Sequence, residues 1–437
     1  MKSSKVLAAL VTMGLAAAVA TPAMALENQF SGSFTSYYDL SNYSASYNMA
    51  QPLKDASTEN YFVQRVRLGY TAKASEDVKL VTKFEFDYGW YGNSSYDSPK
   101  GGRNQGGGLG ADSVQMETKN LYLDLNVVKG LNAKIGMQGN SDAFKGLIFD
   151  ADMAGVLLSH EYDKASVSAG FFRFGDNTNV STWSNIDTIG KYTQDMFSLD
   201  GKYSISKDLK IGAAYYYFGD NRVPAATAKV HTLGLNAEGA VGPVALSGFV
   251  LSQFGDYNST KDAEGYAFNL GAKMPLGGGT GRTEFLYASG GKDGKSLYIP
   301  RSPIGTEGGG FYDNEMIMLS RDKNAYTIDN AIVYDANNSD QGVIFASAGY
   351  DYPFTPKLSG SANLGLGWVA KDVAVVKHDS KYLGTEVNCE VNYKLMPSVT
   401  LGARAGYVVL GDYFKNTDAG KTPDDPYDVK LIAKFAF

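Results

Sequence analysis

Histidine and cysteine side chains carry much of the acid–base, nucleophilic and metal chemistry of proteins. This sequence holds three histidines, His160, His231 and His378, and one cysteine, Cys389. None of the histidines stands in a metal-ligand spacing such as HExxH, and neither a GxSxG nucleophile elbow nor a Walker A motif occurs. Ser159 and His160 are adjacent, so in a strand their side chains point to opposite faces. We therefore predict no enzymatic activity and no catalytic residue.

Two other motifs are candidate ligand sites. Asp150 and Asp152 form an acidic pair, but the dense oxygen pattern of a calcium loop is missing around them. The glycine-rich run 101–110 is not followed by a helical pattern, so it is a loop tip and not a phosphate cradle. No CxxC or CxxCH motif is present, which excludes thiolate metal clusters and covalent haem. We predict no metal and no cofactor.

The remaining chemistry lies in charges spaced two residues apart. Arg65 and Arg67 are such a pair, and Lys83, Glu85 and Asp87 form a second series. Residues i and i+2 share one face of a strand, so each series projects its charges together. Arg282 with Glu284, and Arg404 alone, are further examples in later segments. Such faces attract or repel ions in water, and because both signs are present we predict no strong ion preference.

The segments that carry these charges alternate strictly between apolar and polar residues. The last segment is the clearest case. One of its faces holds Tyr427, Val429, Leu431, Ala433, Phe435 and Phe437. The other face holds Asp428, Lys430, Ile432, Lys434 and Ala436. A period of two predicts a β-strand with one apolar and one mainly charged face.

The alternation recurs often enough to predict 18 strands. The predicted segments are 28–40, 60–73, 78–90, 114–127, 131–138, 154–162, 165–174, 194–205, 209–218, 230–240, 244–254, 263–274, 279–289, 341–352, 358–370, 382–394, 399–410 and 426–437. Short turns alternate with long loops, as in transmembrane barrels. Counts of 16 or 20 strands are the alternatives. The count of 20 arises if Glu315–Leu319 and Ala325–Tyr334 form one more hairpin within 290–340.

We predict an all-β, antiparallel transmembrane barrel. No apolar run of about 18 residues follows the N-terminal segment, which excludes a helical membrane protein. Strands in lipid cannot leave backbone groups unpaired, so the sheet must close on itself. A soluble β-sandwich or propeller also alternates, but its strands are usually shorter.

The N-terminus has the pattern of an export signal. Lys2 and Lys5 precede an uncharged apolar run, 6–20, and Ala23-Met24-Ala25 is a small-x-small cleavage site. We predict a signal peptide at 1–25 and a mature barrel domain at 26–437. The whole chain has a formal net charge of −6, and loss of the leader removes two lysines. This acidic balance argues against a nucleic-acid partner.

The terminal strand resembles the C-terminal signal of Gram-negative outer-membrane porins, which ends in an aromatic residue after alternating apolar ones. The resemblance implies that the barrel assembly machinery recognises Tyr427, Leu431, Phe435 and Phe437. The block from Gly384 to Asp412 also resembles the last hairpin of a porin group from delta-proteobacteria. The wider family implies passive diffusion of small hydrophilic solutes, often through a trimer.

The resemblance also implies a loop folded inward after the fifth strand. That loop is 139–153, which carries Asp142, Asp150 and Asp152. We hypothesise that these acids face a basic patch of Arg65, Arg67 and Lys83 across a constriction. The loop 290–340 is a rival constriction.

The favoured function is an outer-membrane channel for ions and small hydrophilic solutes. The expected surroundings are outer-membrane lipid and lipopolysaccharide, with both termini in the periplasm and with a homotrimer as one arrangement. The alternative is a barrel that acts as a sheath or scaffold for a partner protein, such as a redox protein. An open lumen discriminates between them, because a porin conducts alone.

Overall fold

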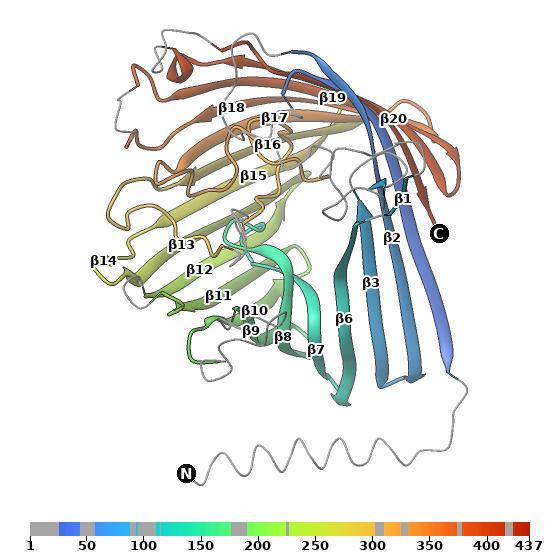
Figure 1. Cartoon of the computed structure of the whole chain (residues 1–437), viewed down its shortest axis with the longest axis vertical. Coiled ribbons are helices and arrows are strands. Elements are labelled where there is room, and N and C mark those ends of the chain that lie inside the picture. The colour runs from blue at the N-terminus through green and yellow to red at the C-terminus, as the bar shows by residue number, and fades with distance from the viewer. Residues whose placement is uncertain are drawn as a thin grey trace.

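The computed structural model describes residues 26–43, 57–87, 93–94, 111–113, 115–175, 190–223, 227–301, 310–324, 331–373, 378–415 and 423–437. Within them, 18 antiparallel strands form one barrel, which the pairing of the first strand with the last closes (Figure 1). The predicted signal peptide, 1–25, lies outside the described residues.

The barrel strands follow one another around the wall in sequence order. They are β1 (Glu27–Ser41), β2 (Glu59–Ser75), β3 (Val78–Asp87), β6 (Gln115–Val128), β7 (Leu131–Ser141), β8 (Asp150–Glu161), β9 (Ala165–Gly175), β10 (Gln194–Ser206), β11 (Leu209–Asp220), β12 (Ala228–Val241), β13 (Val244–Asn258), β15 (Tyr266–Leu276), β16 (Gly279–Ala288), β17 (Val343–Pro353), β18 (Leu358–Trp368), β19 (Tyr382–Met396), β20 (Val399–Leu410) and β21 (Tyr427–Ala436). Three short strands stand outside this series: β4 (Asn93–Ser94), β5 (Ala111–Ser113) and β14 (Lys261–Asp262).

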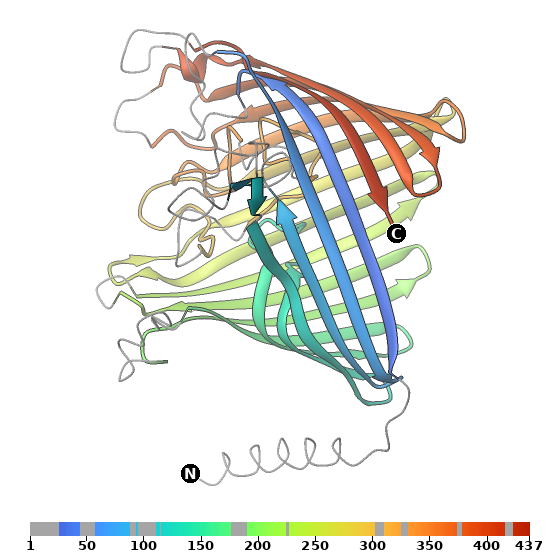
Figure 2. The ribbon, with the colours of Figure 1, turned by 45° about the vertical axis from the view of Figure 1, so that its right-hand side comes forward.

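The predicted all-β barrel of 18 strands is confirmed. Long and short connections alternate around it, and Figure 2 shows the long loops gathered at one end and the tight turns at the other. We call these the long-loop end and the short-turn end. The extra hairpin of the 20-strand alternative is absent from the described part of 290–340, where Ser320 and Val333 form an isolated bridge and not a strand pair. Among the described residues, no helix is long and apolar enough to cross a membrane.

The outward faces of the strands are apolar, as the alternation predicts. Large apolar side chains stand exposed on strands all around the wall. Examples are Leu68, Leu158, Phe197, Leu235, Leu270 and Leu431. In a soluble protein such a surface would be costly, whereas lipid tails cover it without cost.

The buried core lies inside the barrel. Two connections fold into the lumen: the short inner loop, residues 142–149, and the long inner loop, by which we mean the described residues 289–301, 310–324 and 331–342 of the β16–β17 connection. Phe144 and Ile148 of the short inner loop join Met318 and Leu319 of the long one in a single apolar cluster. Inward-facing residues of the wall, such as Tyr216, complete it. The two inner loops therefore fill much of the lumen and limit the space left for anything else.

Candidate functional site

A buried carboxylate on the wall holds the long inner loop. Glu386 on β19 is fully buried and accepts hydrogen bonds from three consecutive backbone N–H groups. The donors are Ile317 at 2.7 Å, Met318 at 3.1 Å and Leu319 at 2.8 Å. Hydrogen bonds to an ionised acceptor are stronger than those between neutral groups, so this contact fixes the backbone of the loop against the wall.

Two further contacts continue the attachment of the long inner loop. Asn388, two residues along the same face of β19, donates to the Glu315 carbonyl at 3.0 Å. Arg404 on β20 pairs with Asp322 at 2.7 Å, and both side chains are buried. The loop is thus held along 315–322. Arg404, predicted to line a pore, lies at this point of attachment.

The short inner loop is held by its own first residue. The two carboxylate oxygens of Asp142 each accept two backbone N–H groups, from Phe144 and Gly146 and from Ile148 and Phe149, at 2.6 to 3.1 Å. Burial raises the pKa of Asp142 to about 6, against the four hydrogen bonds, which favour the charged form. The hypothesis had Asp142 facing the basic patch. Its carboxylate is instead turned into its own loop.

The two inner loops also touch each other. The backbone N–H of Phe311 donates to the Gly146 carbonyl at 2.7 Å, and that of Asp313 donates to the Lys145 carbonyl at 2.9 Å. The side chain of Lys145 pairs with Glu284 on β16, which also accepts from Tyr312 of the long inner loop. Glu284, predicted to line a pore, therefore ties both loops to the wall.

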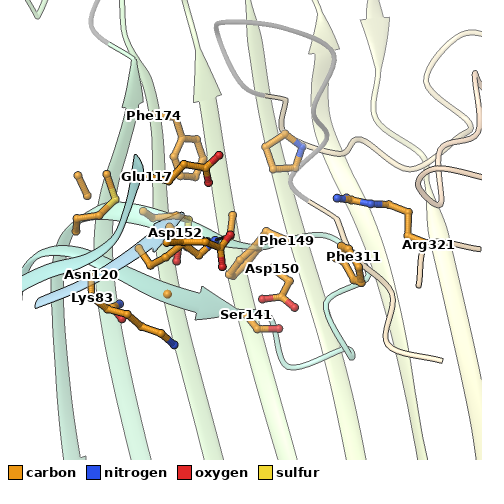
Figure 3. A pocket seen from close by; sticks show the side chains of 18 of the residues that line it. Lys83, Glu117, Asn120, Ser141, Phe149, Asp150, Asp152, Phe174, Phe311 and Arg321 are labelled. Atoms are coloured by element: carbon orange, nitrogen blue, oxygen red, sulfur yellow. Dashed lines mark ion pairs between the residues drawn. The ribbon is translucent and has the colours of Figure 1, made fainter. Parts of the chain in front are cut away.

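Beside the inner loops, toward the long-loop end, lies a cavity of about 1060 Å³, the outer cavity. Figure 3 shows Lys83 and Asn120 on one side of it and Phe311 and Arg321 on the other. Among the described residues that line it, nine are basic: Arg65, Arg67, Lys83, Lys119, Lys145, Arg173, Arg301, Arg321 and Lys323. Five are acidic: Glu85, Glu117, Asp150, Asp152 and Asp313.

The structure brings the predicted basic patch and two of the predicted acids into this one cavity. Their pairing differs from the hypothesis, because Glu85 lies against the patch. Its carboxylate pairs with Arg67 and, at 3.6 Å, with Arg65. Asp152 pairs instead with Lys119 at 2.6 Å, and Asp150 lines the cavity. The backbone of Asp87 lies opposite Arg65 in the β2–β3 ladder, while its side chain is outside the described residues.

Lys119 was missed by the sequence analysis for a definable reason. It has the same parity as Leu121, which faces outward, so strict alternation puts Lys119 on the lipid side. The β3–β6 register shifts between Lys83 and Phe84, which leaves Lys119 as an extra residue in β6. Such a bulge reverses the parity beyond it and turns Lys119 into the lumen.

A second cavity of about 520 Å³ lies toward the short-turn end, the inner cavity. Much of its lining is uncharged and polar: Asn314, Asn324, Asn363, Asn388, Asn392, Ser359, Ser361 and Thr280. Arg282, another predicted pore residue, supports this wall. Its guanidinium pairs with Asp351 at 2.7 Å and also bonds Asn363.

The two cavities adjoin at the long inner loop. Lys323 and Asn324 are the residues that line both of them in the described part of the chain. Lys323 pairs with Glu315 at 2.6 Å, so an ion pair stands where the cavities meet. We call this place the neck. The loop 290–340 was predicted as a rival constriction, and the structure has both loops inside the barrel.

The four predicted assembly residues lie at the closing strand. Leu431 and Phe435 point outward on β21, as does Phe437 after it, and the rings of Phe435 and Phe437 stack at 5.4 Å. Phe437 also exchanges two backbone hydrogen bonds of 3.0 Å with Gly32. The C-terminal residue thus helps to close the barrel.

Comparison with known proteins places the chain by fold. No protein-family model matches it, and no curated protein matches it. Solved structures do match over nearly the full length of the chain. One is OccAB4 of Acinetobacter baumannii, which is 13% identical and has a TM-score of 0.54. The match covers 95% of this chain and 100% of OccAB4. OccK8 (OprE) of Pseudomonas aeruginosa matches with 13% identity, 94% and 98% coverage and a TM-score of 0.56.

A third match is the outer membrane protein OpdK of Pseudomonas aeruginosa, with 12% identity, 94% and 99% coverage and a TM-score of 0.55. Identities this low show a common fold and carry no residue roles across. The chain has the 18-strand barrel fold of these outer-membrane proteins.

Proposed function

We propose that this protein is an outer-membrane channel through which ions and small hydrophilic solutes diffuse passively. The observation that carries the proposal is the pair of polar cavities that adjoin at Lys323 and Asn324 inside an apolar-faced barrel. Hydrated charges and amides along such a path replace part of a solute's water shell, which lowers the barrier to crossing.

The neck is the place where solutes meet the protein most closely. There the ammonium of Lys323 and the carboxylate of Glu315 offer one positive and one negative group side by side. Neither sign dominates, in keeping with a channel for small polar solutes of either charge. The outer cavity has more basic than acidic side chains, nine against five, and they stand in mixed clusters such as Arg65, Arg67 and Glu85.

The small free volume inside the barrel does not favour the alternative function as a sheath or scaffold for a partner protein. The two inner loops pack against the wall in one apolar cluster, and the two cavities described above measure about 1060 and 520 Å³. Such volumes suit small molecules. A partner protein in the lumen would have to displace both loops and break the contacts of Glu386 and Asp142.

The test is conductance of the purified, refolded chain in a planar bilayer under a salt gradient. Discrete current steps are expected, and the reversal potential then gives the ion preference. Heat-modifiable migration on gels shows whether the barrel is folded. A folded barrel that never conducts would overturn the proposal and favour the partner-binding alternative.

Other features of the cellular setting are part of the same proposal. The short turns and both termini face the periplasm, the long loops face outward, and 1–25 is cleaved on export. The aromatic C-terminal strand engages the assembly machinery. Lipid and lipopolysaccharide surround the barrel, and a homotrimer is the proposed assembly, which native mass measurement in detergent tests.

A further inference from the structure

The β7–β8 hairpin leaves the barrel wall near its tip. On the β6 side, the ladder ends with the pair Leu121 and Met137. Strand β6 nevertheless continues to Gln115, and β7 continues to Ser141. Within the described residues, the segment 115–120 of β6 is therefore paired with β3 alone.

The same separation occurs on the other side of the hairpin. The β8–β9 ladder ends with the pair Gly155 and Phe172, although β8 begins at Asp150 and β9 continues to Gly175. Beyond these points β7 and β8 stay paired to each other. Figure 1 shows the upper ends of β7 and β8 bending away from β6 toward the inside of the barrel. We call this part of the hairpin, residues 137–154, the hairpin tip.

The parity of β8 shows what this bend does. Val156 and Leu158 point outward to the lipid side and are exposed. Asp152 and Ala154 have the same parity, yet both line the outer cavity. The opposite face carries Met153, which is buried in the apolar cluster and borders the same cavity from inside the barrel. A carboxylate on a lipid-facing position is costly, and the bend turns this face toward the water-filled cavity instead.

The outer cavity extends to the outer side of the wall. Arg173 alternates with Phe172, whose side chain is buried inside the barrel, so Arg173 points outward. Its guanidinium lies 5.9 Å from the ring of Phe171 and pairs with Asp195 of β10 at 2.7 Å. Arg173 nevertheless lines the same cavity as Arg65, which faces the lumen. One cavity thus touches both sides of the wall.

We infer that the outer cavity has a second, lateral entrance through the wall between β6 and β9. The inference rests on the proposed channel function and adds a route to it. The ion pair of Lys119 and Asp152, at 2.6 Å, spans the threshold between β6 and the hairpin tip. The aromatic pair of half-buried Phe171 and exposed Phe197, just below Arg173, marks the level of the lipid headgroups.

The chemistry of the rim defines what passes. Glu117 and Lys119 stand on the β6 side and Arg173 on the β9 side, so the rim is charged and hydrated. Lipid tails are excluded by such groups, because burying a charge in hydrocarbon is costly. The entrance admits water, ions and small charged solutes that gather in the headgroup layer, in addition to those that arrive along the barrel axis.

The test uses fluorescent labels at single cysteines in a Cys389→Ser background, since the natural cysteine is exposed. Asp152→Cys reports the hairpin tip. Lys83→Cys reports the enclosed lumen wall, and Val156→Cys reports the lipid-facing side of the same strand as Asp152. Each labelled barrel is placed in vesicles that contain nitroxide on the lipid headgroup, and quenching by that lipid and by aqueous iodide is measured.

A lateral entrance predicts that the label at 152 is quenched by both agents, the label at 83 by iodide alone and the label at 156 by the lipid nitroxide alone. Quenching at 152 by iodide alone, as at 83, would overturn the inference. Ser141→Cys provides a second report, because Ser141 lines the cavity from the same hairpin tip and has no ion pair to lose. The quenching measurement does not depend on conductance. Failure of the proposed channel function is therefore distinguished from failure of the lateral entrance.

Discussion

The two inner loops are held in opposite ways. The short inner loop is held by Asp142, whose four N–H partners lie two to seven residues away along the chain. The long inner loop is held by Glu386, whose three N–H partners lie 67 to 69 residues away. One loop carries its own anchor, and the other depends on a wall strand. The difference predicts that the long loop can be detached from the wall while the short loop keeps its shape.

Replacing Glu386 with alanine is expected to have the largest effect. It leaves three buried N–H groups without an acceptor, and each unpaired group costs about 1–3 kcal/mol. The long inner loop should then leave the wall and the neck should widen. We expect a higher single-channel conductance and a lower temperature for the gel-mobility shift that reports unfolding.

Glu390→Ala is the matched control. Glu390 lies four residues along the same face of β19 and lines the inner cavity, and its carboxylate accepts a hydrogen bond from Asn392 of the same strand. The Glu390→Ala variant removes one negative charge, as Glu386→Ala does, but keeps the contact of Glu386 with the long inner loop. Equal conductance changes in the two variants would show that charge, and not attachment of the loop, sets the current.

Asp142→Ala is expected to have the second largest effect, and on a different property. Four N–H groups lose their acceptor, but the loop stays connected to two paired strands, β7 and β8. We expect noisier open-channel current with a small change in mean conductance. Asp150→Ala, eight residues further along and exposed, is the control and should leave the noise unchanged. Quiet current from the Asp142 variant would mean that the apolar cluster alone holds this loop.

The comparison of the loops also shows what the sequence can and cannot predict. Alternation acts over neighbouring residues, and it predicted the strands closely: 399–410 coincides with β20. It failed where the geometry departs from a regular ladder, at the bulge that turns Lys119 inward and at the bent hairpin tip. It also gave no information on which wall residue meets which loop, because the contact of Glu386 joins segments that only closure of the barrel brings together.

A third prediction concerns Arg65 and Arg67, which line the outer cavity from β2. Changing Arg65 and Arg67 together to glutamate places two new acids beside Glu85, where the wild-type side chains form ion pairs. Because negative charges attract cations and repel anions, the cavity should favour cations. The reversal potential in a salt gradient should move toward the value for a cation-selective channel. An unchanged reversal potential would mean that this patch lies off the path of the ions.

The smallest change is Lys323→Met at the neck. A unit charge acts on an ion about 4 Å away with about 1 kcal/mol in water, which corresponds to roughly a fivefold change in permeability ratio. Loss of Lys323 leaves Glu315 without its 2.6 Å partner, so the shift should favour cations. Lys83→Met removes the same charge from the outer cavity alone and should shift the reversal potential less, because that cavity has the larger volume. A larger shift from Lys83 would place the selective step above the neck, and the attachment of the long inner loop would then control only the size of the current.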